Sequence, residues 1–294
     1  MSRFFIIDGY ALLYRSYFAL IKNPTKTSYG LDTSPLYGFV KTLFTLLDLW
    51  HPDYITVVFD TNAKTWRHES FMEYKATRPK QPQVITDSLP YLKEILTAMS
   101  ITFYEKEGFE ADDLAGTMTK KIPEDINIYL MTQDKDYAQL VKKNVFLFKS
   151  IMPSGYKAFA MPEVLTLWGV AIPEQVVDIL ALVGDTSDNI PGVVGVGKET
   201  AKKLIQQYMS VENILVHKDE LPDKIKNNID DEKLIMSKKL VTITTDVDFC
   251  FDYNECIKKD FNDQALGKIF KQLEFESFYK KISRPKKEGQ LGLF

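Results

Sequence analysis

The chain has 294 residues, of which 45% are hydrophobic and 26% are charged, as in an ordinary globular protein with a substantial core. Its net charge is −3, and its two cysteines, Cys250 and Cys256, are too few for a disulfide framework or a zinc site. We find no signal-peptide pattern and no apolar run as long as a membrane span, so we expect a cytoplasmic protein without a membrane partner.

The first half of the sequence alternates between strand patterns and helix patterns. Strands are predicted at residues 3–7, 54–59, 101–104 and 126–131, and helices at 10–21, 34–50 and about 89–99. Ser34 and Pro35 are typical of an N-cap and a first helical residue, and Pro90 would start or kink the last of these helices. This alternation predicts an α/β fold with a doubly wound, mainly parallel sheet, in which ligands bind at the carboxyl ends of the strands.

Acidic residues recur just beyond the ends of these strands. The set comprises Asp8, Asp60, Glu110, Asp112, Asp113, Asp134 and Asp136. A solvated surface charge would have no reason to follow this rule, although Asp8 alone could cap a helix and Asp134 with Asp136 could form a turn. Because the carboxyl ends of parallel strands meet at one edge of a sheet, we expect a ring of carboxylates there.

A ring of carboxylates needs cations, because like charges in one crevice otherwise take up protons. The three histidines lack the spacing of a ligand set, so the pattern favours an all-oxygen site for Mg²⁺ or Mn²⁺. Two such ions about 3.5–4 Å apart would activate a water and stabilise the leaving oxygen of a phosphodiester. If nine of the 40 acids form this site, the 37 basic residues exceed the remaining acids by six, so nucleic acid is not excluded.

Residues 192–198 read G-V-V-G-V-G-K, which formally matches a phosphate-binding P-loop. Glu199 stands where that motif needs Ser or Thr, and a polar loop precedes it, which argues against a nucleoside triphosphatase. What remains is a helix, a glycine hairpin and a second helix from Lys198 to about Tyr208 that also carries Lys202 and Lys203. Its free backbone N–H groups suit phosphate and would bind DNA without regard to base sequence.

Residues 64–80 mix five basic side chains with the aromatics Trp66, Phe71 and Tyr74. Lys75 and Arg78 are three positions apart, so in a helix they would share one face and could bind phosphate while the aromatics stack on bases. The alternative is a solvated helix with its apolar side on the core. Similarly, Asp185 and Asp188 in the loop G-D-T-S-D-N-I-P could be further metal ligands or turn formers.

Seven segments together resemble the 5′-nuclease (flap endonuclease) superfamily, and most specifically the N-terminal 5′→3′ exonuclease domain of bacterial DNA polymerase I. They are I-I-D-G-Y-A-L-L-Y-R, V-V-F-D, W-R-H-E, Y-K-A-T-R-P, G-F-E-A-D-D, T-Q-D-K-D and G-D-T-S-D-N-I-P-G-V-V-G-V-G-K-E-T-A. The resemblance runs from about residue 3 to about residue 279, and its one small departure is Trp66 where phenylalanine is commoner.

The resemblance implies a site residue by residue. One metal ion would be held by Asp8, Asp60, Glu110 and Asp112, with Asp113 acting through water, and the second by Asp134, Asp136, Asp185 and Asp188. Lys75 and Arg78 would bind the scissile phosphate at the base of a helical arch, Tyr14 would stack on a base, and Arg15 and Arg67 would contact DNA. A helix-hairpin-helix element with Gly192, Gly195, Gly197, Lys198 and Lys202 would grip the duplex, where the family often holds K⁺.

The implied architecture is a PIN-like α/β nuclease core over residues 1–170 with an arch at about 62–92, a helical DNA-binding part over 171–283, and a tail over 284–294. The implied function is that of a monomeric hydrolase, which removes RNA primers and 5′ flaps in replication and repair and leaves 5′-phosphates. The alternatives are a PIN-like ribonuclease, which would lack the hairpin and the arch, and a non-catalytic DNA-structure binder, which would lack carboxylates.

The last five residues form one further motif. Gln290, Leu291, Leu293 and Phe294, in Q-L-G-L-F, resemble the peptide that docks bacterial proteins on the sliding clamp. The same residues could instead begin the linker of a longer polymerase, and the sequence does not distinguish these readings.

Overall fold

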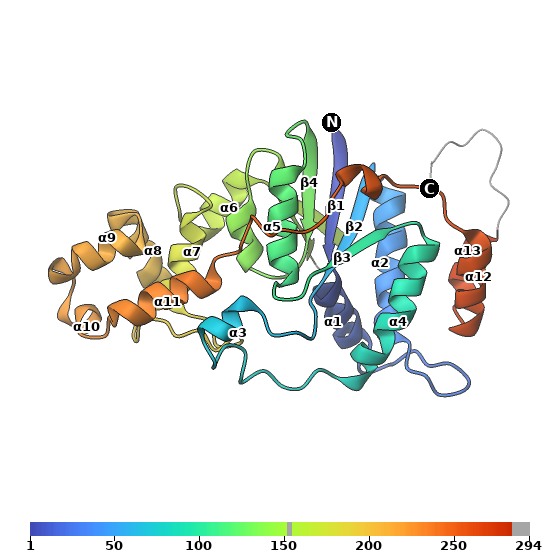
Figure 1. The fold of residues 1–294 in the computed structure, drawn as a ribbon, viewed down its shortest axis with the longest axis horizontal. Coiled ribbons are helices and arrows are strands. Elements are labelled where there is room, and N and C mark those ends of the chain that lie inside the picture. The colour runs from blue at the N-terminus through green and yellow to red at the C-terminus, as the bar shows by residue number, and fades with distance from the viewer. Residues whose placement is uncertain (152–154, 284–294) are drawn as a thin grey trace.

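The structure is a computed structural model that describes residues 1–151 and 155–283, and its described strands form one six-stranded sheet (Figure 1). The strands are β1 (Ser2–Asp8), β2 (Tyr54–Phe59), β3 (Thr102–Glu105), β4 (Ile126–Met131), β5 (Val145–Ile151) and β6 (Gly155–Phe159). Their order across the sheet is β3-β2-β1-β4-β5-β6, and all neighbours are parallel except β5 and β6. The predicted doubly wound, mainly parallel sheet is confirmed, while β5 and β6 were not predicted.

The central strand β1 is buried on both faces, as expected for a parallel sheet covered by helices. Phe4 and Ile6 point into one hydrophobic cluster, which includes Leu114 on the helix α5 (Ala111–Lys121). Phe5 and Ile7 point the opposite way, into a second cluster built with the helices α1 (Gly9–Leu20), α2 (Ser34–Trp50) and α4 (Gln83–Ala98). The alternation of side chains along a strand therefore explains why four consecutive apolar residues are needed here.

The helices lie on both faces of the sheet and extend beyond it at one end. The α/β part contains α1 (Gly9–Leu20), α2 (Ser34–Trp50), α3 (Trp66–Ser70), α4 (Gln83–Ala98), α5 (Ala111–Lys121), η1 (Asp136–Leu140) and α6 (Met161–Trp168). The helical part contains α7 (Gln175–Val183), α8 (Lys198–Tyr208), α9 (Val211–Val216), η2 (Lys218–Glu220), α10 (Asp223–Lys226) and α11 (Asp231–Val241). This second group lies to the left of the sheet in Figure 1.

The last elements return to the α/β part. They are η3 (Tyr253–Cys256), α12 (Asp263–Gln272) and α13 (Glu276–Ile282). Phe270 and Phe278 are buried in the same cluster as Phe5 and Leu43, and α12 contacts α4. The division at residue 170 stays a prediction, but the end of the helical half is packed on the first half.

The predicted helical arch at about 62–92 is helical only at its two ends, in α3 and in α4. Residues 71–82 form turns and extended chain, so Lys75 and Arg78 do not share a helical face. Lys75 has a positive φ of 58°, and Arg78 precedes Pro79; both conditions disfavour the right-handed helix. Pro90 lies inside α4 and does not start it, and the N-cap of α2 is Thr33, one residue before the predicted Ser34.

Candidate active site

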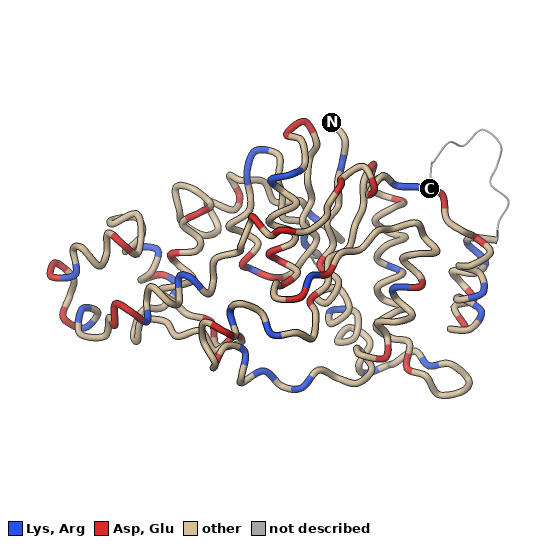
Figure 2. The backbone as a smooth tube through the Cα atoms, in the orientation of Figure 1, with Lys and Arg blue, Asp and Glu red and all other residues tan. Residues whose placement is uncertain are grey.

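A cavity of about 360 Å³ opens at the edge of the sheet where β1, β2 and β4 end. The winding of the sheet reverses between β1 and β4, and open α/β sheets bind ligands at such a reversal. Five of the predicted acids line the cavity, namely Asp8, Asp60, Glu110, Asp112 and Asp134. Figure 2 shows acidic segments gathered in this region and basic residues along the chain between α3 and α4.

Asp8 and Asp60 are fixed by hydrogen bonds from the starts of two helices. Asp8 caps α1 through its Oδ1, which accepts from the backbone N of Ala11 at 2.9 Å, and its Oδ2 accepts from the hydroxyl of Thr132 at 3.0 Å. Asp60 Oδ1 accepts from the backbone N of Ala111 at 2.8 Å. The capping explanation for Asp8 is therefore correct, and the same carboxylate still lines the cavity.

These carboxylates crowd one another in a partly buried site. Burial, reinforced by the charge of Asp60, raises the pKa of Asp8 to about 7. Burial and the charge of Glu110 raise the pKa of Asp60, and burial also raises the pKa of Asp112 well above its ordinary value. Their negative charges are thus incompletely compensated by the protein, which is the condition that a bound cation relieves.

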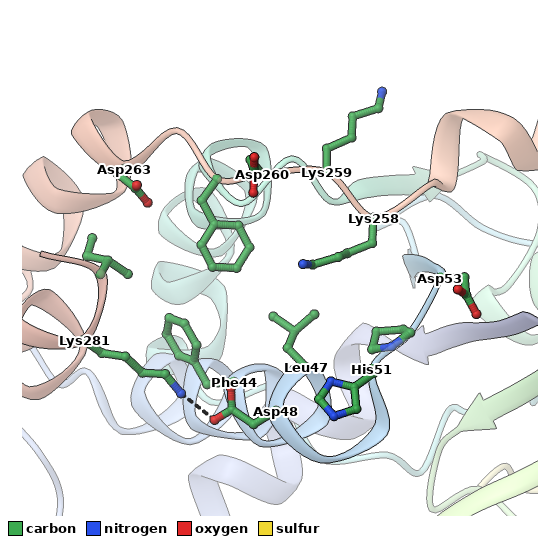
Figure 3. A pocket seen from close by; sticks show the side chains of 13 residues that line it. Phe44, Leu47, Asp48, His51, Asp53, Lys258, Lys259, Asp260, Asp263 and Lys281 are labelled. Atoms are coloured by element: carbon green, nitrogen blue, oxygen red, sulfur yellow. Dashed lines mark hydrogen bonds and ion pairs between the residues drawn. The ribbon is translucent and has the colours of Figure 1, made fainter. Parts of the chain in front are cut away.

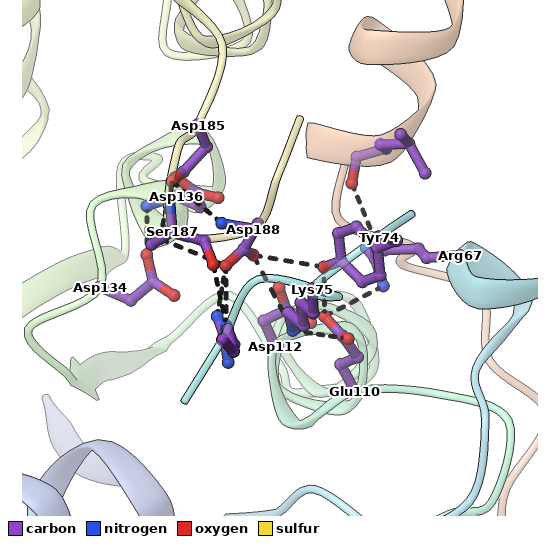
Figure 4. Close-up of polar contacts among 12 residues, drawn as sticks. Arg67, Tyr74, Lys75, Glu110, Asp112, Asp134, Asp136, Asp185, Ser187 and Asp188 are labelled. Carbon is purple, nitrogen blue, oxygen red and sulfur yellow. Dashed lines mark hydrogen bonds and ion pairs between the residues drawn. The ribbon is translucent and has the colours of Figure 1, made fainter. Parts of the chain in front are cut away.

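The second acidic group lies between β4 and the first residue of η1 and in the loop after α7 (Figure 4). Burial and the neighbouring Asp134 raise the pKa of Asp136 to about 8, and its Oδ1 has no hydrogen-bond partner among the described residues. Asp185 accepts from the backbone N of Ser187 at 2.7 Å and pairs with Lys135 at 2.7 Å. Burial opposes these bonds, but they outweigh it and lower the pKa of Asp185. Asp185 is therefore a turn former as well as a candidate ligand.

Three residues from the segment after α3 bind these acids, and two of them, Tyr74 and Lys75, contact both acidic groups (Figure 4). The Nζ of Lys75 donates to Glu110 Oε1 at 2.7 Å and lies 3.9 Å from Asp188 Oδ2. Arg78 donates through its guanidinium to Asp188 Oδ1. The buried hydroxyl of Tyr74 donates to Glu110 Oε2 at 3.0 Å and approaches Asp188 Oδ2 at 3.4 Å.

Arg67 and Asp113 do not lie where the sequence predicted. The Nη1 and Nη2 of Arg67 bind the two carboxylate oxygens of Asp113 at 2.7 and 2.8 Å, and the two residues are 1% and 0% exposed. Arg67 also donates to the backbone carbonyls of Leu240 and Thr242. The structure therefore places Arg67 in the core, where its guanidinium is held by protein acceptors, and the DNA contact of Arg67 stays a prediction. Asp113 faces Arg67 and does not line the cavity.

Two predicted DNA contacts lie on α1. Tyr14 is half-buried in the cavity wall, and its hydroxyl lies 3.4 Å from Gln81 Oε1. Arg15 donates from Nη1 to the hydroxyl of Tyr156 at 2.9 Å, and its guanidinium carbon lies 5.1 Å from the centre of that ring.

The predicted glycine hairpin connects α7 with α8, so a helix and not a strand precedes the P-loop-like residues. A Cβ on Gly192 would lie 2.3 Å from the carbonyl oxygen of Val183, which explains the requirement for glycine there. Gly195 is exposed with a φ of 84°, and Gly197 is the N-cap of α8. Lys198 is exposed, while Lys202 pairs with Glu199 at 2.9 Å.

The cavity gathers carboxylate groups whose pKa values are raised, and oxygen donors of this type suit hard cations. In the arrangement seen here, however, no three Asp, Glu, His or Cys side chains of the described chain converge as a group that could hold a metal ion. Lys75, Arg78 and Lys135 occupy positions against Glu110, Asp188 and Asp185 instead.

Sequence reasoning missed several residues that shape this site. Lys135 and Thr132 each bind a predicted ligand, and Tyr137 lines the cavity with a buried hydroxyl that has no hydrogen-bond partner in the described residues. Tyr74 was expected to stack on a base, but its hydroxyl binds Glu110 instead. Lys135 adjoins Asp134 and Asp136, and this adjacency was the available signal.

A second cavity, of about 310 Å³, lies between α2 and the segment that leads into α12 (Figure 3). It mixes charged and apolar residues, including Phe44, His51, Lys258 and the ion pair of Lys281 with Asp48. It contains none of the strand-end carboxylates discussed above.

Among the described residues, no helix combines the length and apolar character needed to span a bilayer. The predicted clamp-binding residues Gln290, Leu291, Leu293 and Phe294 lie outside the described residues.

Comparison with known proteins identifies the family. Residues 3–169 match the model of the 5′-3′ exonuclease N-terminal resolvase-like domain, and residues 171–264 match that of the 5′-3′ exonuclease C-terminal SAM fold. The chain is 36% identical over 285 residues to a 5′-3′ exonuclease of Aquifex aeolicus, covering 97% of this chain and 96% of that protein. It is 35% identical over 292 residues to DNA polymerase I of Bacillus subtilis, covering 97% of this chain and 33% of that protein.

The chain thus spans about a third of the length of several curated relatives, all of them DNA polymerases I. Among solved structures, the bacteriophage T5 5′-exonuclease with bound zinc ions matches with a TM-score of 0.65 and 23% identity over 95% of this chain and 98% of that chain. That likeness supports the fold. The family models and the full-length match to the Aquifex protein go further, and we conclude that the chain belongs to the 5′-3′ exonuclease family, a family of nucleases.

Proposed function

We propose that this chain is a divalent-metal-dependent 5′→3′ exonuclease and structure-specific 5′-flap endonuclease that leaves 5′-phosphate and 3′-hydroxyl ends. The observation that carries the proposal is the cavity at the carboxyl edge of the sheet, where carboxylates from the ends of β1 and β2 and from the loops after β3 and β4 meet two cationic side chains. A phosphodiester placed there would lie between groups that attract metal ions and groups that attract phosphate.

The residues that would hold metal ions fall into two sets. Asp8, Asp60, Glu110 and Asp112 form the first, and Asp134, Asp136, Asp185 and Asp188 form the second. When bound, two Mg²⁺ or Mn²⁺ ions would supply a more acidic water and stabilise charge on the leaving oxygen. Three observations support this assignment: the oxygen-only donors, the raised pKa values of Asp8 and Asp136, and the Oδ1 of Asp136, which has no hydrogen-bond partner within the described part of the chain. Solved structures of the T5 nuclease are described as containing metal ions, and one of them as containing DNA.

The chain's own side chains would position the substrate. Lys75 and Arg78 would bind the scissile phosphate and stabilise the charge that develops on its oxygens. Thr132 holds one oxygen of Asp8 while Ala111 holds one of Asp60, so each carboxylate keeps a fixed orientation toward the cavity. Tyr14 presents its half-buried ring at the cavity wall, where a base could stack.

The α7–α8 hairpin would bind the backbone of the downstream duplex. Gly195 and the first backbone N–H groups of α8 are exposed there, with Lys198 beside them. We carry the family's K⁺ ion to this hairpin as part of the proposal. The biological role would be the removal of RNA primers and 5′ flaps by a monomer, with the clamp as partner through Gln290–Phe294.

Cleavage of a 5′-labelled flap duplex, beside a blunt duplex and free single strand, tests the proposal. Cutting at the flap junction in Mg²⁺, and none in excess EDTA, is the expected result. Tight flap binding without cutting in Mg²⁺ or Mn²⁺ would instead identify a DNA-structure-binding protein. Preferential cutting of single-stranded RNA would favour the ribonuclease alternative.

A further inference from the structure

We propose that the turn at residues 73–78 is a cation latch: Lys75 and Arg78 neutralise Glu110 and Asp188 until divalent ions replace them, and only then become free for the DNA phosphate. The inference rests on the proposed function, because it assigns a second state to the same site. It makes metal loading, and not DNA alone, the event that releases these two side chains.

The contacts of Lys75 carry the first step. Its side chain is 18% exposed and ends 2.7 Å from an oxygen of Glu110, whose side chain is 9% exposed. The second oxygen of Glu110 accepts from Tyr74 and lies 3.6 Å from Arg67 Nη1. Both oxygens of Glu110 are thus already engaged by side chains of this protein, and a metal ion that used Glu110 would compete with Lys75 for it.

Arg78 makes the corresponding contact on the other acidic group. Its guanidinium binds Asp188 Oδ1, and its Nε also lies 3.3 Å from the carbonyl oxygen of Ser187. The side chain of Arg78 remains 50% exposed, so it can leave Asp188 without opening the core. Lys75 and Arg78 therefore bind one carboxylate from each of the two proposed metal sets.

The backbone holds the turn in this state. The N–H of Lys75 donates to the carbonyl of Asp188 at 2.8 Å, and the side-chain amide of Asn189 donates to the carbonyl of Glu73 at 2.8 Å. Lys75 adopts its left-handed φ of 58° within this clamp, a conformation that a non-glycine residue leaves readily when its partners are lost. Side-chain release and backbone release are therefore coupled.

The latch also explains why the carboxylates of the described residues do not converge as a ready metal group. While Lys75 and Arg78 bind Glu110 and Asp188, these two carboxylates are directed at side-chain cations and not at a shared metal position. Neutralisation by these side chains lets the nuclease fold around a concentration of negative charge before metal arrives. It also keeps Lys75 and Arg78 unavailable to phosphate during that time.

Calorimetric titration with MgCl₂ in the absence of DNA tests the competition. Lys75→Gln should bind Mg²⁺ about fivefold or more tightly than the wild type, because a competing cation has been removed. Lys75→Arg keeps the charge and should retain the wild-type affinity. Lys80→Gln is the matched control, because Lys80 is an exposed lysine of the same segment. The Mg²⁺ affinity of this variant should equal that of the wild type.

Hydrogen exchange on the wild-type protein supplies a second readout that needs no variant. Saturating Mg²⁺ should accelerate exchange of the amide of Lys75 by about tenfold or more, since its bond to Asp188 opens. The latch is overturned if exchange is unchanged at saturation, or if Lys75→Gln binds Mg²⁺ no more tightly than Lys80→Gln. If the wild type cuts flaps but either of these results is obtained, the latch is wrong and the proposed nuclease function stands. If the wild type neither binds Mg²⁺ nor cuts flaps, both the latch and the proposed nuclease function are wrong.

Discussion

Arg67 and Asp113 form a two-pronged ion pair inside the protein, with nitrogen–oxygen distances of 2.7 and 2.8 Å. The pair joins α3 to α5, and the carbonyls of Leu240 and Thr242 attach the end of α11 to the same guanidinium. Asp113 Oδ1 also accepts from the backbone N of Thr244 at 2.8 Å. The third carboxylate of the 110–113 cluster therefore holds three segments together beside the cavity.

Breaking this pair should cost folding stability. Asp113→Ala leaves a buried guanidinium without its partner, and we expect a loss of about 3–5 kcal/mol in the free energy of unfolding. Urea unfolding followed by tryptophan fluorescence measures it. Asp219→Ala removes an exposed partner of Lys226 and should leave the urea midpoint unchanged. If Asp113→Ala keeps the wild-type urea midpoint but loses cleavage, Asp113 acts in the metal site and not in folding.

The charge of Asp8 should matter for catalysis more than for folding. Asparagine caps a helix as well as aspartate does, so Asp8→Asn keeps the start of α1 but removes a negative charge from the cavity. We expect flap cleavage to fall about 10²–10³-fold or more, with flap affinity by fluorescence anisotropy nearly unchanged. Asp230→Asn makes the same change at the cap of α11 and should cut at the wild-type rate. Wild-type cleavage by Asp8→Asn would contradict the metal assignment.

Without metal, the folded protein should lose stability as the pH rises from 5.5 to 8. The pKa values of Asp8 and Asp136 are raised to about 7 and about 8, so the folded state binds more protons than the unfolded state in this range. The lowered pKa of Asp185 has the opposite effect, but only at more acidic pH. Thermal midpoints in EDTA should therefore be lower at pH 8, and Asp136→Asn should narrow the difference. A midpoint that rises with pH would refute this account.

Lys198 should contribute to DNA binding through charge alone. Lys198→Ala is expected to weaken flap binding similarly for all sequences and to reduce the slope of log Kd against log salt concentration by about 1. Lys143 is exposed just before β5, at the opposite edge of the sheet from the cavity, and Lys143→Ala should leave the slope unchanged. Equal slopes for the wild type and Lys198→Ala would remove α8 from the DNA interface.

The position of the cavity could be predicted from the sequence because it follows from the geometry of a parallel sheet. Strand periodicity located β1, β2 and β4, and acids at their ends had to meet at one edge of a parallel sheet. The loop carboxylates Asp185 and Asp188 followed no such rule. Only the family resemblance brought them to the same site, where Asp188 now meets Arg78 and Lys75.

The charge of a segment did not predict which of its side chains would be buried. Arg67 lies in a basic segment that reads as a surface, and nothing local indicates that Asp113, 46 positions away, accepts both of its nitrogens inside the protein. Lys75 and Arg78 have helical spacing, but the contacts of the segment with Asp188 and Asn189 override it. Long-range pairing of this kind is invisible to periodicity.

The return of α12 and α13 to the α/β part affects how this chain can be divided. The second family match ends at residue 264, yet Leu266, Phe270 and Phe278, which follow it, are buried against α2 and α4. A protein that ended at that boundary would lack these three residues and would expose the apolar surfaces of α2 and α4. Both helices lie far from the cut along the chain. The helical half is thus inserted between two segments of one hydrophobic core, and the chain on both sides of it belongs to the body that carries the carboxylates.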